Sequence, residues 1–471
     1  MAASRTEHQH GSQPGRSLLE EILCPRCSGV LLGEGIPVAC PGCGTRFPRL
    51  GRIPVVLSDA ESYLRSCRQR LEEIENEVKT TVRRIREELE GPDILPYTHA
   101  RGRAMSKGVW QQFTDVRNLL KPLLGRNPGD RLEPATMIDV PVTLEYLPYL
   151  YRDWGWPPDP DGGENENILG LFEEVLGGRE LGRTLILGAG ACRLPYDIHM
   201  KHPAAELVML DIDPILFGCA SAVTHGESLV MHEANLEICS ISEASREWRL
   251  KAHSGPVDEN RFHLVISDAL TPPFPDEVLD TVITPWFIDQ GPPDVRDLIG
   301  TLHRLLRPGG KWINVGPLTY EPTVPLPLRF SQDEVFDLAR RVGFEIQEHV
   351  TTSAPYLVSK LNGRGKVEWI TAFTALKVQK PAEAEYSPGP PPWLLFSHLP
   401  VPGFPGQKSI SLNQPLFRLV VSAIDGKRSI DDLAGIIAEN VDAPGFAPHE
   451  FRQAVRQCLG QVHPGCRTMR G

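Results

Sequence analysis

Four cysteines near the start of the chain have the spacing of a metal site. Cys24 and Cys27 form one C-x-x-C pair, in the turn CPRC, and Cys40 and Cys43 form a second, in the turn CPGCG. Such Pro- and Gly-containing turns can direct two thiolates each at one ion, and four sulfur ligands suit tetrahedral zinc. Because cysteines fill all four positions, the sequence predicts a structural zinc site without an open position for substrate. The alternative is four reduced thiols without a metal.

Further along the chain, a glycine-rich turn and two acidic residues follow apolar runs. LILGAGACRL joins a predicted strand to a helix, where Gly188 and Gly190 let the backbone turn sharply and approach a ligand closely. Asp211 ends a second predicted strand, where it can accept hydrogen bonds from ribose hydroxyls. Asp268 ends a third and is placed to meet an adenine amine. Each acid alone is more simply a helix cap or a loop charge, but together with a PGG turn before a late strand they favour an adenosylmethionine-dependent methyltransferase.

A third carboxylate follows a fourth apolar run, in TVITPWFIDQGPPD. The strand pattern ends near Trp286 and Phe287, and Asp289 comes directly after them. Asp is favoured just ahead of a helix, so Asp289 can cap a helix that begins near Pro292. The two aromatic side chains can enclose a cationic group or simply pack in the core.

These residues lie in a region where predicted strands alternate with predicted helices, which indicates a mostly parallel, doubly wound α/β sheet. A long charged pattern without Pro or Gly precedes it and predicts an amphipathic helix over residues 59–90. Packing of this helix on the next domain is favoured over a coiled coil, although a homodimer stays open. Less regular backbone is expected from there to about residue 161. The predicted domains are a zinc ribbon (18–57), a helical arm and connector (58–145), the α/β domain (146–380), a Pro-rich linker (381–394) and a small helical domain of winged-helix type (395–471).

Composition narrows the function classes. The chain has 471 residues and a formal net charge of −11, which disfavours a protein that grips long nucleic acid. The first residues lack the apolar region of a signal peptide, and no run of about 18 apolar residues predicts a membrane span. We therefore expect a cytoplasmic protein. Its ten cysteines favour a metal site plus free thiols over a disulfide framework.

Four motifs resemble the carnosine N-methyltransferase family, also called N2227-like proteins. They are RDWG, LGAGACRL, ITPWFIDQ and GGKWINVGPLTY, and the resemblance covers residues 146–378. It implies a Rossmann-like class I methyltransferase domain with S-adenosyl-L-methionine as cofactor. The residues it implies for the cofactor are Gly188, Gly190 and Arg193 near the methionine moiety, Asp211 at the ribose, and Asp268 and Ala269 at the adenine. Arg193 would pair with the cofactor carboxylate or with a neighbouring acid.

The resemblance also implies that Asp289 binds the substrate, as an aspartate that accepts the N–H of an imidazole. Trp286, Phe287 and Tyr320 would enclose the ring. After GPLTY this chain has Glu321 where the family has a histidine, and Glu321 suits a cationic or amine-bearing substrate.

The predicted activity is therefore N-methylation of an imidazole in a small molecule or a peptide. The C-terminal stretch QPLFRLVVSAIDGKRSIDDLAGIIAE resembles PqqD-like peptide-chaperone domains, which favours a peptide or protein acceptor. A zinc ribbon ahead of a methyltransferase also occurs in some ribosomal-RNA methyltransferases, so methylation of RNA is an alternative. A catalytically silent methyltransferase fold that serves as a binding scaffold is another.

Overall fold

The structure is a computed structural model. It describes residues 17–31, 36–120, 140–157, 163–237, 240–290, 294–322, 324–378, 401, 415–440, 451–452, 454–456 and 458–459. The chain divides into two compact units, Met1–Pro292 with Gly300–Lys380 and Pro293–Ile299 with Pro381–Gly471. No helix within these described ranges is both long and apolar enough to cross a membrane.

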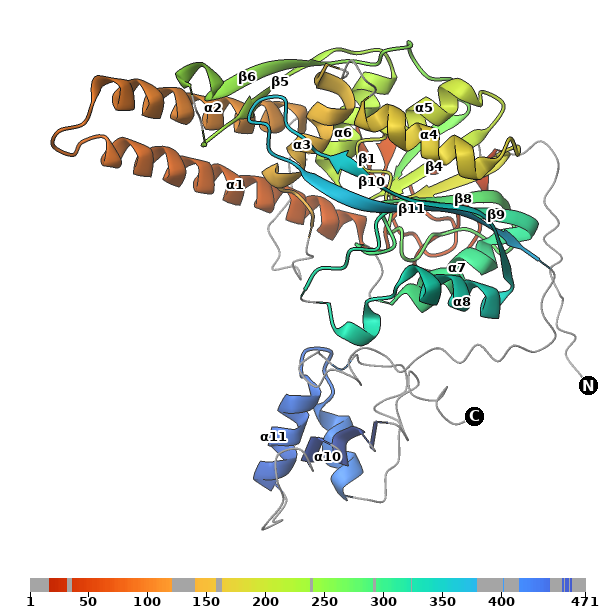
Figure 1. Cartoon of the computed structure of the whole chain (residues 1–471). Helices are drawn as coiled ribbons and strands as arrows, with labels where there is room; N and C mark the ends of the chain where they lie inside the picture. Colours follow the sequence, from red (N-terminus) through yellow and green to blue (C-terminus); the bar gives the residue numbers. More distant parts are fainter. Residues whose placement is uncertain are drawn as a thin grey trace, which may run out of the picture. The chain divides into compact units, whose positions relative to one another are not determined.

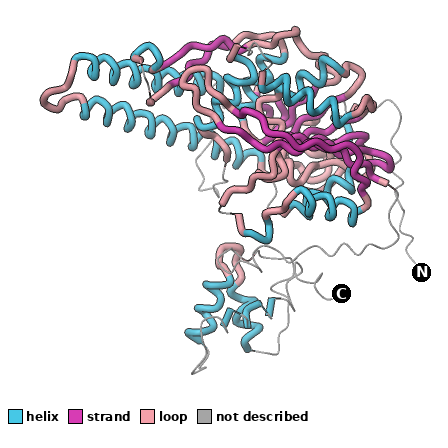
Figure 2. The backbone as a smooth tube through the Cα atoms, in the orientation of Figure 1, coloured by secondary structure: helices cyan, strands magenta, loops and turns pink. Residues whose placement is uncertain are grey.

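A seven-stranded sheet forms the centre of the larger unit (Figures 1 and 2). Its order is β10-β11-β9-β8-β3-β4-β7, in which β11 runs antiparallel to both neighbours and the remaining pairs are parallel. The strands are β3 (Arg183–Leu187), β4 (Glu206–Asp211), β7 (Phe262–Ile266), β8 (Leu279–Pro285), β9 (Leu306–Gly316), β10 (Phe344–Tyr356) and β11 (Lys366–Lys377). The predicted Rossmann-like methyltransferase sheet is confirmed. Strand order reverses beside β3, which places the crevice for a ligand at the carboxyl ends of β3 and its neighbours.

Helices cover both faces of this sheet, which explains why β3, β4 and β8 are buried almost throughout. On one face lie α4 (Glu164–Leu176), α5 (Arg193–Lys201) and α6 (Pro214–Thr224), and on the other lies α8 (Gln332–Val342) (Figure 1). The helix α7 (Val295–Leu305) leads directly into β9, and the short turn η5 (Leu326–Leu328) precedes α8.

Two long helices, α1 (Ala60–Glu88) and α2 (Pro96–Leu120), pack side by side as a hairpin (Figure 1). The helix α1 follows the predicted pattern and is capped by Asp59. The expectation of less regular backbone is wrong for α2. Two glycines weaken its helical pattern, and packing explains both: a Cβ on Gly102 would lie 2.6 Å from Leu89 Cδ1, and one on Gly108 would lie 2.9 Å from the carbonyl oxygen of Ala244. Close contact therefore outweighs the low helix propensity of glycine.

Between α2 and α4 the chain forms η2 (Leu144–Tyr146), α3 (Leu147–Leu150) and the π-helical turn η3 (Tyr151–Gly155). The strands β5 (Leu229–Ala234) and β6 (Ser245–Leu250), joined through η4 (Ile241–Glu243), form a separate antiparallel pair that packs against α2.

The N-terminal cysteine region contains η1 (Leu18–Glu21) and the two-residue strands β1 (Arg49–Leu50) and β2 (Ile53–Pro54). Just after β2, Val55 forms a parallel bridge with Ile266 of β7. Because β7 is the last strand of the large sheet, this region covers an edge that would otherwise expose unpaired backbone groups.

The smaller unit contains α10 (Pro415–Ala423) and α11 (Ile430–Asn440), which pack through a cluster that includes Val420, Ile430 and Leu433. The hydroxyl of Ser429 accepts a hydrogen bond from the Asp432 backbone N–H at 3.2 Å, so Ser429 caps α11 as its position suggests. Winged-helix and PqqD-like character stay predictions. The predicted linker, residues 381–394, lies outside the described residues.

Candidate functional site

The four cysteine sulfurs lie within 4.8 Å of one another. Sγ of Cys24 is 3.6 Å from that of Cys43, and Sγ of Cys27 is 3.7 Å from that of Cys40. A tetrahedral zinc ion with Zn–S bonds of roughly 2.3 Å separates its sulfurs by about 3.8 Å. The donor set and its spacing therefore fit zinc.

A glycine loop joins β3 to α5 at the carboxyl edge of the sheet. The N–H of Gly188 donates to the carbonyl of Leu210 at 2.9 Å. A Cβ on Gly188 would lie 2.5 Å from Cδ2 of Phe287, so no larger residue fits there. At Gly190, which has a φ of +56°, a Cβ would meet nothing within 4 Å. The loop thus packs on Phe287 at one point and leaves its backbone open to a ligand at another.

Asp211 ties this loop to the end of β4. Its Oδ2 accepts the N–H of Gly190 at 2.7 Å, and its Oδ1 accepts those of Ile212 and Asp213 at 2.7 and 2.9 Å. Burial raises the pKa of Asp211, and these three N–H groups oppose the shift. Each oxygen of an ionised carboxylate can accept more than one hydrogen bond, so the contacts leave capacity for a ribose hydroxyl.

Asp268 turns the chain after β7. Its Oδ1 accepts the Leu270 N–H at 2.9 Å and its Oδ2 accepts the Thr271 hydroxyl at 2.7 Å. Asp268 therefore stabilises its own loop, which is the simpler role considered from the sequence. Asp268 and Ala269 are both half-buried, and their contact with adenine stays a prediction.

Arg193, the first residue of α5, is bound by the protein itself. Its Nε donates to Asp197 at 2.8 Å, its Nη1 donates to the Asp153 carbonyl at 2.8 Å, and its Nη2 lies 3.5 Å from Glu166. Of the two roles considered from sequence, the structure contains the pairing with neighbouring acids. Contact with the cofactor carboxylate stays a prediction.

Asp289 lies just beyond β8 and is only 6% exposed. Its Oδ2 accepts the Thr319 N–H at 3.0 Å, from the segment that follows β9. Its Oδ1 is buried and has no hydrogen-bond partner among the residues that the structure describes. Burial raises the pKa of Asp289 to about 6, while the Thr319 N–H and the interaction with the Gln290 side chain act to lower it. Because this value still lies below 7, the carboxylate is ionised at neutral pH.

An aromatic cluster lies at the same edge of the sheet as this carboxylate. Trp286 has a φ of +48° and stacks on Tyr356 at the end of β10. Tyr149 of α3 meets Tyr356 edge-on at 6.2 Å, and the Arg152 guanidinium lies over both of these rings, at 5.5 and 5.4 Å. The indole Nε1 of Trp286 is buried without a partner in the described part of the chain.

The other residues predicted for the substrate differ in accessibility. Phe287 is buried against the glycine loop, Tyr320 is half-buried, and Glu321 is exposed. Sequence reasoning missed a different acid, Glu368 near the start of β11, which is 6% exposed and forms an ion pair with Lys366. The charge of Glu368 raises the pKa of Asp289 further, so the two carboxylates are close enough to interact.

Sequence comparison connects this region to known enzymes. A family model described as carnosine N-methyltransferase matches residues 220–368. The carnosine N-methyltransferase of Rattus norvegicus is 33% identical over 255 residues, which are 50% of this chain and 63% of the relative. That of Schizosaccharomyces pombe is 24% identical over 238 residues, 44% of this chain and 60% of the relative. The chain thus spans less than two thirds of the length of these relatives.

Comparison of structures adds little. Phosphoethanolamine N-methyltransferase 2 of Haemonchus contortus aligns with a TM-score of 0.32 at 14% identity, over 50% of this chain and 56% of that one. A TM-score this low carries no weight, and the fold assignment rests on the strand order described above. Over about half of its length this chain is similar to the carnosine N-methyltransferases, and its larger unit contains the Rossmann-like methyltransferase sheet described above.

Proposed function

We propose that the larger unit is an S-adenosyl-L-methionine-dependent N-methyltransferase whose acceptor is an imidazole ring. The observation that carries the proposal is Oδ1 of Asp289, a buried oxygen without a partner among the described residues. Leaving a buried polar atom unpaired costs free energy, so a ligand that donates a hydrogen bond is the natural partner. The sequence relatives, named for carnosine, support an imidazole as that ligand.

The cofactor would be held at the carboxyl edge of β3, β4 and β7. Gly190 offers open backbone, Asp211 offers acceptor oxygens to the ribose, and Asp268 with Ala269 borders the adenine in this proposal. When bound, adenosylmethionine supplies an electrophilic methyl group on its sulfonium. The four cysteines would hold zinc in a structural role, because no ligand position stays open.

Asp289 acts on the acceptor. A neutral imidazole has one N–H and one bare nitrogen. By accepting the N–H at Oδ1, Asp289 fixes the tautomer and holds the bare nitrogen as the nucleophile. Positive charge develops on the ring as that nitrogen gains the methyl group, and the carboxylate stabilises it. The methylated ring then gives up its N–H proton, which a carboxylate with a pKa of about 6 can accept. Trp286, which stacks on Tyr356, would bind the charged ring through its outer face.

The acceptor is a small molecule or a peptide in this proposal. Carnosine is the substrate in the names of the relatives. A histidine-containing peptide fits the same Asp289 chemistry, and the buried Glu368 favours an acceptor that also carries an amine. The net charge of −11 opposes an RNA acceptor.

The test uses adenosylmethionine labelled in its methyl group. The chain is incubated with carnosine, with histidine-containing peptides and with cell lysate, and the label is counted in small molecules, protein and RNA. Label on an imidazole nitrogen that is lost in Asp289→Asn is the expected result. Label in RNA, or label that persists in Asp289→Asn, would overturn the proposal.

A further inference from the structure

The metal module, residues 17–31 and 36–58, contacts the loop that carries Asp268, and the helix α1 that follows the module contacts the loop that carries Asp211. From these contacts we infer that metal binding by the four cysteines raises the affinity of the chain for its cofactor. The inference rests on the cofactor role proposed above for Asp211 and Asp268.

The first contact extends the sheet beside Asp268. The N–H of Val56 donates to the carbonyl of Ile266 at 2.8 Å, and the Ser267 hydroxyl donates to the carbonyl of Val56 at 3.0 Å. Ile266 and Ser267 are the two residues that precede Asp268. The module therefore fixes the start of the loop that would border the adenine.

The second contact fixes the other end of the same loop. The N–H of Leu23 donates to the carbonyl of Pro273 at 2.7 Å. Leu23 precedes the ligand Cys24, and it also pairs with Val30 across the first cysteine turn. The position of this donor thus depends on the turn that holds Cys24 and Cys27. The loop from Asp268 to Thr271 lies between the two contacts.

The third contact lies beside Asp211. The hydroxyl of Tyr63, in the first turn of α1, donates to the carbonyl of Ile212 at 2.8 Å. Tyr63 is only 1% exposed, and Asp59, which caps α1, directly follows the module. The module therefore holds the loop of Asp268 at both ends, and the helix that follows the module holds the residue next to Asp211.

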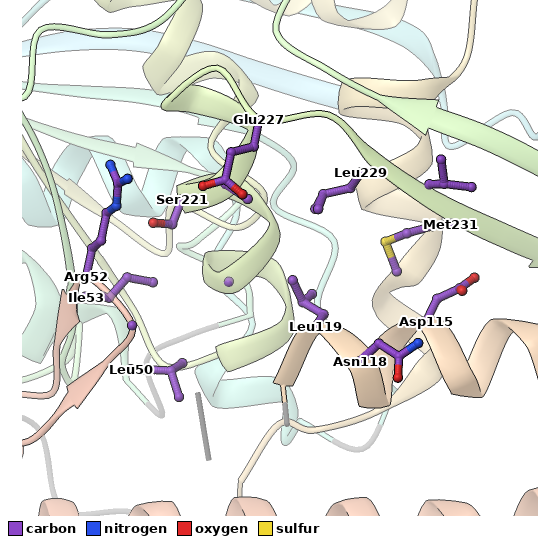
Figure 3. A pocket seen from close by; sticks show the side chains of 14 residues that line it. Leu50, Arg52, Ile53, Asp115, Asn118, Leu119, Ser221, Glu227, Leu229 and Met231 are labelled. Atoms are coloured by element: carbon purple, nitrogen blue, oxygen red, sulfur yellow. The ribbon is translucent and has the colours of Figure 1, made fainter. Parts of the chain in front are cut away.

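Another part of the module borders a cavity. A cavity of about 410 Å³ is lined by Leu50 and Ile53 of the β1–β2 hairpin, Ser221 of α6 and Leu119 of α2, and Figure 3 shows these side chains. The contacts of Leu23 and Val56, in contrast, join the module directly to the loop that carries Asp268. These contacts are therefore suited to transmit the state of the metal.

Metal binding and folding are coupled in such modules, because the ligand geometry exists only when the turns are formed. Loss of zinc would release the Cys24 turn and weaken the Leu23 and Val56 contacts. The acids would then be less well ordered for the cofactor, which lowers affinity. Linkage is reciprocal, so a bound cofactor must hold the metal more tightly by the same factor.

The experiment measures binding without an acceptor. S-adenosylhomocysteine affinity is determined by calorimetry for the zinc-loaded full chain and for the chain after chelation, with far-UV circular dichroism as the check on folding. A loss of about tenfold on chelation is expected, within the usual range for coupled sites. Zinc release to a chromogenic chelator should slow when S-adenosylhomocysteine is present.

A variant separates coupling from global unfolding. Tyr63→Phe keeps the ring and removes only the hydroxyl donor, so zinc content should stay the same while S-adenosylhomocysteine affinity falls about fivefold. The matched control is Tyr97→Phe, since Tyr97 is 79% exposed at the start of α2. Equal affinity with and without zinc in a folded chain, or no effect of Tyr63→Phe, would overturn the inference. If the zinc-loaded chain does not bind S-adenosylhomocysteine at all, the proposed function itself is wrong.

Discussion

Trp286 stacks on Tyr356 with ring centroids 5.3 Å apart and ring planes 13° from parallel. The two residues lie at the carboxyl ends of β8 and β10, which have β9 and β11 between them in the sheet. Gly316, at the end of β9, makes the arrangement feasible, because a Cβ there would lie 2.7 Å from the Trp286 backbone nitrogen. An uncommon backbone conformation at Trp286, with φ at +48°, thus places an aromatic platform three residues before Asp289.

The stack should contribute to acceptor binding. Trp286→Leu is expected to raise the KM for carnosine or a histidine peptide by about tenfold, because a cation over an aromatic face is worth 1 to 2 kcal/mol when partly desolvated. S-adenosylhomocysteine affinity, measured by calorimetry, should stay within about twofold. Trp110→Leu is the control, since Trp110 lies on α2 and is 37% exposed. Equal losses of both affinities would mean that Trp286 serves only core packing.

Asp289→Asn should separate chemistry from cofactor binding. The amide can still accept the Thr319 N–H but carries no charge to stabilise an imidazolium, so kcat is expected to fall by about 100-fold or more. Single-turnover transfer of labelled methyl measures the rate, and calorimetry measures cofactor affinity, which should not change. A similar loss in both quantities would assign Asp289 to the structure rather than to the acceptor.

The residues at the parallel strand ends were predictable because each closes an apolar run. Asp211 is the last residue of β4, Asp268 and Asp289 follow β7 and β8, and parallel strands bring their carboxyl ends to one edge. Each buried strand appears in the sequence as a continuous apolar run, so its end can be recognised without knowledge of the rest of the fold.

The positions of Tyr356 and Glu368 at the site became visible only in the structure. Glu368 lies near the beginning of β11, and only the antiparallel insertion of β11 between β9 and β10 brings that beginning to the same edge. Such a pairing is a long-range property that local patterns do not reveal. For the same reason α2 was missed, because Gly102 and Gly108 are explained only by the residues that pack on them.

Ionisation of Asp289 should lower the free energy of unfolding of the chain. Burial raises its pKa to about 6 in the folded chain, above the unfolded value of about 3.9. A group of this kind stabilises fully below the unfolded pKa and loses that contribution as the pH rises through 6. Asp289→Asn is therefore expected to raise the free energy of unfolding at pH 8, by up to roughly 3 kcal/mol, and to have little effect at pH 4. Thermal melts of both proteins at the two pH values provide the measurement. A variant that melts lower at pH 8 would contradict the assigned pKa shift.

The cysteine cluster should bind one metal ion. Protein purified without chelators is expected to contain about one zinc per chain by elemental analysis, since four thiolates complete one tetrahedral site. Cys40→Ser should lower that content strongly, because Cys40 is a buried member of the cluster. Cys458→Ser is the control, as Cys458 lies in the smaller unit and outside the cluster. A full zinc content in Cys40→Ser would place the metal elsewhere.

Glu368 should determine whether the site prefers acceptors that carry an amine. Its carboxylate is 6% exposed, pairs with Lys366 and interacts with the charge of Asp289, so it can bind a second cationic group of the acceptor. We expect Glu368→Gln to lower the ratio of kcat/KM for carnosine to that for N-acetylcarnosine by about tenfold, the usual effect of losing one charged hydrogen bond. The acetylated compound keeps the imidazole and lacks the amine, so its own kcat/KM should change little.

Glu321→Gln is the matched variant for this experiment, because Glu321 is the acid that the sequence motif points to and its side chain is exposed. The ratio should stay constant in Glu321→Gln if recognition of the amine depends on the buried acid. A ratio that falls in Glu321→Gln and not in Glu368→Gln would instead support the exposed residue. Both variants retain Asp289, so methyl transfer to N-acetylcarnosine serves as the internal standard for both ratios.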